Sequence, residues 1–214
     1  IAQAFVRDPG IAQFVIDEGV KFVTTSAGSP ERYTAELKAG GLTVFHVVPT
    51  LKAALKAVDA GVDGLVVEGA EGGGFKNTRD VSSMVLLPLI RSKVDVPIIA
   101  AGGFVDGRSM AAAFALGAEG VQLGTRMVSA AESPVHRNWK DAIVAAAETD
   151  TVFLTRFHGP ALRALRTART SRMERTLENT FNEFGDVQPV AQILAQIREE
   201  FFAVLGGLAH EYVD

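Results

Sequence analysis

Two short glycine-containing segments have the residue types that hold a phosphate group. They are Ala101–Phe104 and Leu123–Arg126, and each directly follows a short apolar run. Gly102, Gly103 and Gly124 have no Cβ, so backbone N–H groups beside them could approach phosphate oxygens closely. A single segment of this kind often does no more than turn a strand into a helix. Two of them, one repeat apart, favour a phosphate site.

The residue that follows the second glycine adds to this chemistry. Thr125 would place a hydroxyl donor at the start of a helix, where backbone N–H groups lack partners and the helix dipole favours an anion. A nicotinamide dinucleotide site of the Rossmann type has no support, because no Gly-x-Gly-x-x-Gly motif follows a strand.

Alternating strands and helices would position these two segments. The predicted strands are Lys21–Thr25, Leu42–Val48, Gly64–Val67, Pro97–Ala101 and Gly120–Leu123. The predicted helices that follow them are Pro30–Ala39, Thr50–Ala60, Val81–Lys93, Gly107–Leu116 and a helix from Thr125. The strands are apolar almost throughout, which is typical of a parallel sheet covered on both faces. The pattern therefore predicts an α/β fold built from repeated βα units.

The best architecture for these units is a (β/α)8 TIM barrel that is only partly represented. A closed barrel needs eight strands in about 250 residues, whereas this chain of 214 residues shows five. We expect the last five of the eight units, which places the glycine segments after strands seven and eight, where many such barrels bind phosphate. A doubly wound sheet of five strands is the alternative.

The remaining residues are expected to form helices. Residues 1–150 are assigned to the barrel portion and residues 151–214 to a C-terminal helical segment. The helices predicted after the last strand are Ser133–Ala147, Ala161–Asn182 and Val187–Val204. Arginines recur every three residues from Arg163 to Arg175. They are interpreted as a solvated helix face or, alternatively, as a docking face for an acidic carrier protein or NADPH.

Composition excludes several classes of protein. Charged residues make up 21% of the chain, the net charge is −4 and there is no basic run, so no nucleic-acid partner is indicated. The absence of cysteine excludes disulfides and a cysteine nucleophile. No apolar stretch of about 18 residues suggests a membrane span, and no His, Asp or Glu set has metal-ligand spacing. We expect a cytoplasmic protein without a metal, and a homodimer is left open as its assembly.

The residues around the glycine segments resemble the nitronate monooxygenase family. Ile98–Arg108 (IIAAGGFVDGR) resembles the family's IAAGGIADGRG, and Ala115–Arg126 (ALGAEGVQLGTR) resembles its ALGAxGVQxGTRF. Val47–Pro49 and Glu132–His136 also resemble segments of the flavin-dependent enoyl-acyl carrier protein reductases of the same superfamily. The resemblance implies an FMN-dependent TIM-barrel oxidoreductase that oxidises small alkyl nitronates with O₂.

The resemblance also implies which residues contact FMN. Those that match flavin-contacting positions of the family are Val47, Glu68, Gly73, Gly74, Gly102, Gly103, Gln122, Gly124 and Thr125. In the family, the residues that match Gly102, Gly103, Gly124 and Thr125 hold the phosphate. Gln122 matches a residue near the ribityl chain or the ring, and Gly73 and Gly74 match glycines that bring backbone against the ring.

This sequence departs from the family at one position of the glycine-rich loop. The family pattern E-G-x-E-A-G-G-H-x-G corresponds to Glu68–Asn77 (EGAEGGGFKN), so Phe75 stands where the family has a histidine. An imidazole exchanges a proton near neutral pH and a phenyl ring does not. The catalytic residue therefore stays unassigned, and Phe75, Lys76 and His46 are the candidates for the substrate pocket.

Two other functions remain open at this point. One is an NAD(P)H-dependent flavin reductase of enoyl thioesters or quinones, for which Phe75 would shape an apolar pocket and an acyl carrier protein is a possible partner. The other is a flavin-binding protein with little turnover, because the family histidine is missing.

Overall fold

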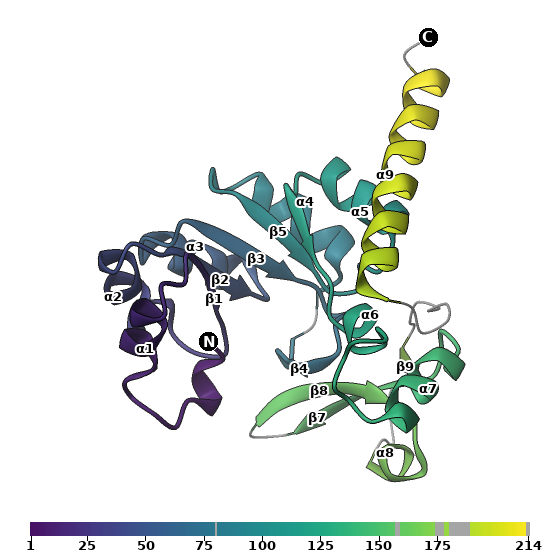
Figure 1. Ribbon diagram of the computed structural model, residues 1–214, viewed down its shortest axis with the longest axis horizontal. Coiled ribbons are helices and arrows are strands. Elements are labelled where there is room, and N and C mark those ends of the chain that lie inside the picture. The colour runs from purple at the N-terminus through teal and green to yellow at the C-terminus, as the bar shows by residue number, and fades with distance from the viewer. Residues whose placement is uncertain (80, 157–158, 174–177, 180–188, 213–214) are drawn as a thin grey trace.

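The computed structural model describes residues 1–79, 81–156, 159–173, 178–179 and 189–212, and Figure 1 shows their arrangement. A parallel sheet of five strands forms the larger part of the fold, in the order β1-β2-β3-β5-β6. The strands are β1 (Phe22–Thr25), β2 (Thr43–Val48), β3 (Gly64–Glu68), β5 (Ile98–Ala101) and β6 (Gly120–Gln122). The sheet curls into half of a barrel, and this confirms the partial TIM barrel and its five predicted strands.

Helices connect the strands and lie on the outer, convex side of the sheet (Figure 1). They are α2 (Thr34–Ala39), α3 (Leu51–Asp59), α4 (Ser83–Arg91), α5 (Gly107–Ala115) and α6 (Thr125–Val128), with α1 (Ile11–Asp17) and the 3₁₀ turns η1 (Gln3–Phe5) and η2 (Pro30–Arg32) before or among them. The local sequence explains where two of these helices, α3 and α5, begin. Thr50 Oγ1 accepts a hydrogen bond from Ala53 N, and Asp106 and Ser109 form a capping box.

The main core lies between the outer face of the sheet and these helices. Leu65 and Ile98 of the strands are fully buried, and so are Leu87 and Ile90 of α4. Each such side chain contributes about 1.5–3 kcal/mol of burial free energy. This core fixes where β3 and β5 end, and those ends carry the predicted site. None of the helices in the described ranges is long and apolar enough to cross a membrane.

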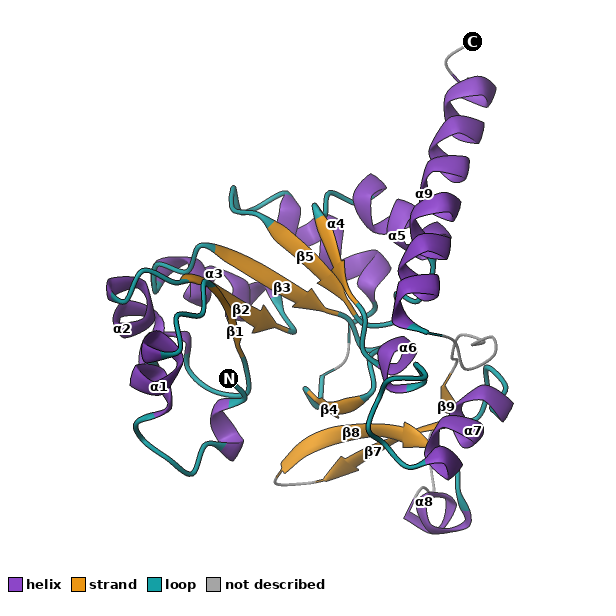
Figure 2. Cartoon of the chain, in the orientation of Figure 1, coloured by secondary structure: helices purple, strands orange, loops and turns teal. Residues whose placement is uncertain are grey.

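A second, antiparallel sheet lies below the carboxyl ends of the parallel strands, as Figure 2 shows. Its order is β4-β8-β7-β9. The strands are β4 (Gly74–Lys76), β7 (Thr151–Arg156), β8 (Gly159–Leu165) and β9 (Glu178–Asn179). The later helices are α7 (Arg137–Ala145), α8 (Ala168–Met173) and α9 (Val190–Tyr212), and α9 packs along α5.

The helix predicted over Ala161–Asn182 is wrong in its first part, because residues 161–165 belong to β8. The segment 151–214 is therefore not simply helical: it opens with the β7–β8 hairpin. Pairing with β4 makes residues 161–165 a strand. β4 lies within the glycine-rich loop and pairs with β8 from Gly74↔Arg163 to Lys76↔Ala161. Residues so far apart in the chain leave no local signal of this pairing. The Phe184–Val187 segment lies outside the described residues.

Candidate functional site

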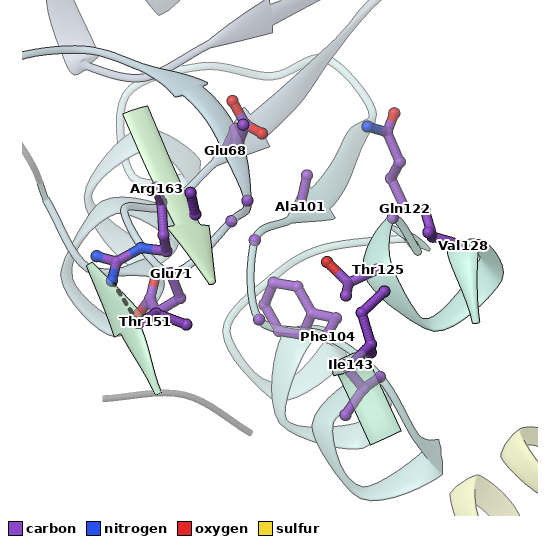
Figure 3. A pocket seen from close by; sticks show the side chains of 18 of the residues that line it. Glu68, Glu71, Ala101, Phe104, Gln122, Thr125, Val128, Ile143, Thr151 and Arg163 are labelled. Atoms are coloured by element: carbon purple, nitrogen blue, oxygen red, sulfur yellow. Dashed lines mark hydrogen bonds between the residues drawn. The ribbon is translucent and has the colours of Figure 1, made fainter. Parts of the chain in front are cut away.

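A cavity of about 310 Å³ lies between the ends of the parallel strands and the small sheet. That volume falls at the lower end of the roughly 300–1,000 Å³ typical of small-molecule sites. Eight of the nine residues predicted to contact FMN line it, and they are Glu68, Gly73, Gly74, Gly102, Gly103, Gln122, Gly124 and Thr125. Figure 3 shows Glu68, Ala101 and Gln122 around one part of the cavity and Thr125 with Phe104 around another.

The turn after β5 has the backbone that only glycine adopts readily. Gly102 and Gly103 have φ angles of +93° and +82°. A Cβ on Gly102 would lie 2.7 Å from the carbonyl oxygen of Gly69, so another loop passes directly against this turn. The glycines therefore serve close backbone packing as well as the sharp turn.

The segment after β6 faces the cavity without obstruction. A Cβ on Gly124 would have no atom within 4 Å. Thr125 begins α6, and its Oγ1 would lie 3.5 Å from a Cβ on Gly73. The two predicted glycine segments and the glycine-rich loop thus converge on one cavity lined by backbone, as a phosphate cradle requires.

Lys76 is the last residue of β4 and does not line the cavity. Its ammonium nitrogen is 2.5 Å from Glu68 Oε1, and the two side chains are 4% and 25% exposed, respectively. Burial lowers the pKa of Lys76, and the carboxylate of Glu68 opposes this shift. Lys76, a candidate for the substrate pocket, is therefore engaged in an ion pair with Glu68 at the end of β3.

Phe75 faces away from this ion pair. Successive residues of a strand point to opposite faces, and on β4 Lys76 turns toward Glu68 whereas the Phe75 ring packs on Phe5 with centroids 5.3 Å apart. Phe75 is 55% exposed. It does not line the described cavity, so the departure from the family pattern lies beside the site.

His46 and Val47 also lie outside the cavity. His46 is buried in the sheet, with Nδ1 2.7 Å from Thr25 Oγ1. Burial lowers the pKa of His46 and so favours the neutral form of its ring. Val47 packs on the inner face of the sheet near Phe45 and Val66. His46 is therefore a buried strand histidine held by a hydrogen bond, and this candidate for the substrate pocket does not line the cavity.

The small sheet and α7 supply site residues that the sequence did not suggest. Trp139 and Ile143 of α7, Thr151 of β7 and Arg163 of β8 line the cavity. Arg163 is 5% exposed, and its Nε donates to Ala70 O at 2.8 Å. The assignment of Arg163 to a solvated helix face is therefore wrong, because β8 turns this side chain inward (Figure 3). The structure does not describe the side chains of Arg169, Arg172 and Arg175.

Among the residues that the structure describes, no group of three or more His, Cys, Asp or Glu could hold a metal ion. The cavity is instead built from glycine backbone, two carboxylates, one guanidinium and an apolar wall.

The model of the nitronate monooxygenase family matches residues 5–204. The chain belongs to the nitronate monooxygenase family. A probable nitronate monooxygenase of Staphylococcus saprophyticus is 33% identical over 161 residues, which are 71% of this chain and 45% of that protein. A (3aS,4S,5R,7aS)-5-hydroxy-7a-methyl-1-oxo-octahydro-1H-indene-4-carboxyl-CoA dehydrogenase of Rhodococcus jostii is 37% identical over 157 residues, which are 73% of this chain and 44% of that protein. The chain thus spans about half the length of these relatives.

Two solved structures have the same architecture. FabK from Thermotoga maritima superposes with a TM-score of 0.86 at 34% identity, over 96% of this chain and 76% of that one. A nitroalkane oxidase from Streptomyces ansochromogenes superposes with a TM-score of 0.76 at 22% identity, over 92% of this chain and 68% of that one, which shows a shared fold.

Proposed function

We propose that this chain is the cofactor-binding part of an FMN-dependent oxidoreductase that oxidises alkyl nitronates with O₂. One observation carries the proposal: the two predicted glycine segments and the glycine-rich loop converge on one cavity at the carboxyl ends of barrel strands. This is where TIM barrels bind phosphate and perform chemistry. Membership of the nitronate monooxygenase family supports FMN as the ligand.

The residues present fit the parts of FMN. Backbone N–H groups of Gly102, Gly103 and Gly124 and the Thr125 hydroxyl would hold the phosphate, with Gln122 toward the ribityl chain. Gly73 and Gly74 have no side chain to obstruct a flat ring. Bound FMN would supply the two-electron acceptor chemistry. The protein would orient it and exclude water with the apolar side chains of Phe104 and Ile143, which are 8% and 2% exposed.

Anaerobic reduction of the FMN-loaded chain tests the proposed reaction. A small alkyl nitronate should bleach the visible absorbance of the oxidised flavin, and admission of O₂ should restore it. A loaded chain that neither NADH, NADPH nor a nitronate reduces would favour a flavin-binding protein with little turnover. That result would contradict the proposal.

A second candidate is an NAD(P)H-dependent reductase of enoyl thioesters or quinones. The structural similarity to FabK at 34% identity favours it. Rapid bleaching by NADH or NADPH, with no response to nitronates, would establish this alternative over the first.

A further inference from the structure

The two glycine loops of the site are joined by a buried serine and a carboxylate. Ser83 is the first residue of α4 and is 6% exposed. Its backbone N–H donates to both carboxylate oxygens of Glu71, at 2.9 and 3.1 Å. The preceding residue, Ser82, makes no side-chain capping bond. Glu71 therefore caps α4 from another loop, where the helix dipole favours its negative charge.

The Ser83 hydroxyl extends this contact to the turn after β5. It lies 3.0 Å from Glu71 Oε2 and 3.1 Å from the carbonyl oxygen of Gly102, so its single proton is shared between the two acceptors. The backbone N–H of Gly69 also donates to Ala101 O at 2.9 Å. Three segments distant in sequence thus meet at one point beside the cavity.

These segments leave no space for a side chain between them. A Cβ on Gly69 would overlap the Ser83 hydroxyl and the Glu71 carboxylate, and a Cβ on Gly102 would lie 3.2 Å from Gly72 N. The packing explains glycine at both positions. It also means that Ser83 cannot move without moving the turn after β5.

Planarity of the peptide bond gives this contact a consequence for the cavity. The carbonyl of Gly102 and the N–H of Gly103 belong to one trans peptide and point in opposite directions. Because Gly102 and Gly103 are both glycines, this peptide can turn over at little steric cost. A hydrogen bond from Ser83 to the Gly102 carbonyl holds one of the two orientations.

We propose that Ser83, held by Glu71, is a positioning residue that fixes the Gly102–Gly103 turn in the orientation that receives the phosphate of the cofactor. The inference rests on the proposed FMN site and adds to it the device that aligns the cradle. Neither residue needs to touch the phosphate itself. Their role is to keep the peptide between Gly102 and Gly103 from turning over.

Binding of FMN to Ser83→Ala tests the proposal. The lost hydrogen bond should raise the Kd for FMN about tenfold. At saturating FMN, the phosphorus-31 resonance of the bound cofactor should move toward that of free FMN. Glu71→Gln keeps one acceptor oxygen, so it should cause a smaller change in the same direction. It also provides a second variant should Ser83→Ala lower the melting temperature.

Ser82→Ala is the matched control, because Ser82 is exposed and adjacent but makes no capping bond. It should leave both the Kd and the phosphorus resonance unchanged. Wild-type affinity in Ser83→Ala would overturn the positioning role, and so would a raised Kd with an unchanged phosphorus resonance. A parent chain that fails to bind FMN would instead overturn the proposed function.

Discussion

At the scale of single residues, the proposed site depends on glycines, whose lack of a Cβ leaves room for a ligand. Gly124 lines the cavity, and a Cβ there would meet no protein atom within 4 Å. Gly124→Ala should therefore lower the melting temperature only slightly: the new methyl group clashes with nothing in the fold, but alanine is a poorer N-cap for α6 than glycine. The methyl group would occupy space meant for the ligand and should raise the Kd for FMN about tenfold, as measured by fluorescence titration.

Gly120→Ala, in the adjacent strand β6, provides the control. A Cβ there would lie 3.6 Å from Ile99 Cγ1, which is an ordinary contact, and Gly120 does not line the cavity. Equal FMN affinities for the two variants would contradict the assigned position of the phosphate cradle.

The buried His46 predicts a dependence of stability on pH. Its pKa is lowered in the folded state by burial, so below its ordinary value of 6.5 the unfolded chain binds more protons than the folded chain. Stability from this group is complete above pH 6.5 and falls as the pH decreases toward the folded pKa. Urea unfolding at pH 7.5 and 5.5 should show this loss in the parent and a smaller loss in His46→Gln. An identical pH dependence in both would show that His46 is not the group responsible.

At the scale of elements, the predictable part of the fold is the part with local signals. Apolar runs bounded by turn residues form the strands β1, β2, β3, β5 and β6. The predicted first and last residue of each strand lie within about two residues of the observed ones. The sequence also predicts helices α3, α4 and α5, and a glycine follows α3 at Gly61 and α5 at Gly117. These elements place Gly102 and Thr125 at the ends of neighbouring strands, so the convergence of the cradle could be anticipated.

The small sheet could not be predicted in the same way. Arg163 and Arg166 lie three residues apart, which suggested a helix, whereas pairing of β8 with β4 and β7 decides its conformation. Strand β4 has three residues, two of which are Gly74 and the Phe75 that replaces the family histidine. Long-range pairing of so short a strand overrides local preference. The cavity wall formed by Thr151 and Arg163 was missed for that reason.

The packing of α9 on α5 gives a prediction about a helix interface. Gly107 donates its N–H to Glu200 Oε2 at 2.9 Å, and a Cβ on Gly107 would overlap the backbone of α9 at Ile197 and Phe201. Gly107→Ala should destabilise the chain by about 1–3 kcal/mol, as expected for overpacking. Chemical denaturation measures this loss of unfolding free energy.

Gly206→Ala is the control within the same helix. A Cβ on Gly206 would meet nothing within 4 Å. Alanine there should stabilise α9 by roughly 0.5–1 kcal/mol, because glycine is a poor helix former. Because helix propensity favours alanine at both positions, equal destabilisation by the two substitutions would contradict the α5–α9 contact as the specific cause of the Gly107 effect.

At the scale of the whole molecule, the half-barrel and the small sheet line one cavity, which is the proposed FMN site. Because FMN would contact both sheets, it should stabilise them together. At a free FMN concentration 100 times the Kd, the expected gain is about 2.7 kcal/mol. Thermal unfolding followed by circular dichroism should show one transition that FMN moves upward. A shift confined to part of a two-step transition would contradict a site shared by the two sheets.

Trp139 offers the most direct test of the central claim. It is the single tryptophan of the chain and it lines the cavity. FMN bound in the cradle should quench its fluorescence at a stoichiometry of one per chain. Riboflavin, which lacks the phosphate, should bind at least about tenfold more weakly, since it loses the charge-assisted hydrogen bonds of the two glycine segments. Equal affinities for FMN and riboflavin, or no quenching by either, would contradict a phosphate cradle built by Gly102, Gly103, Gly124 and Thr125.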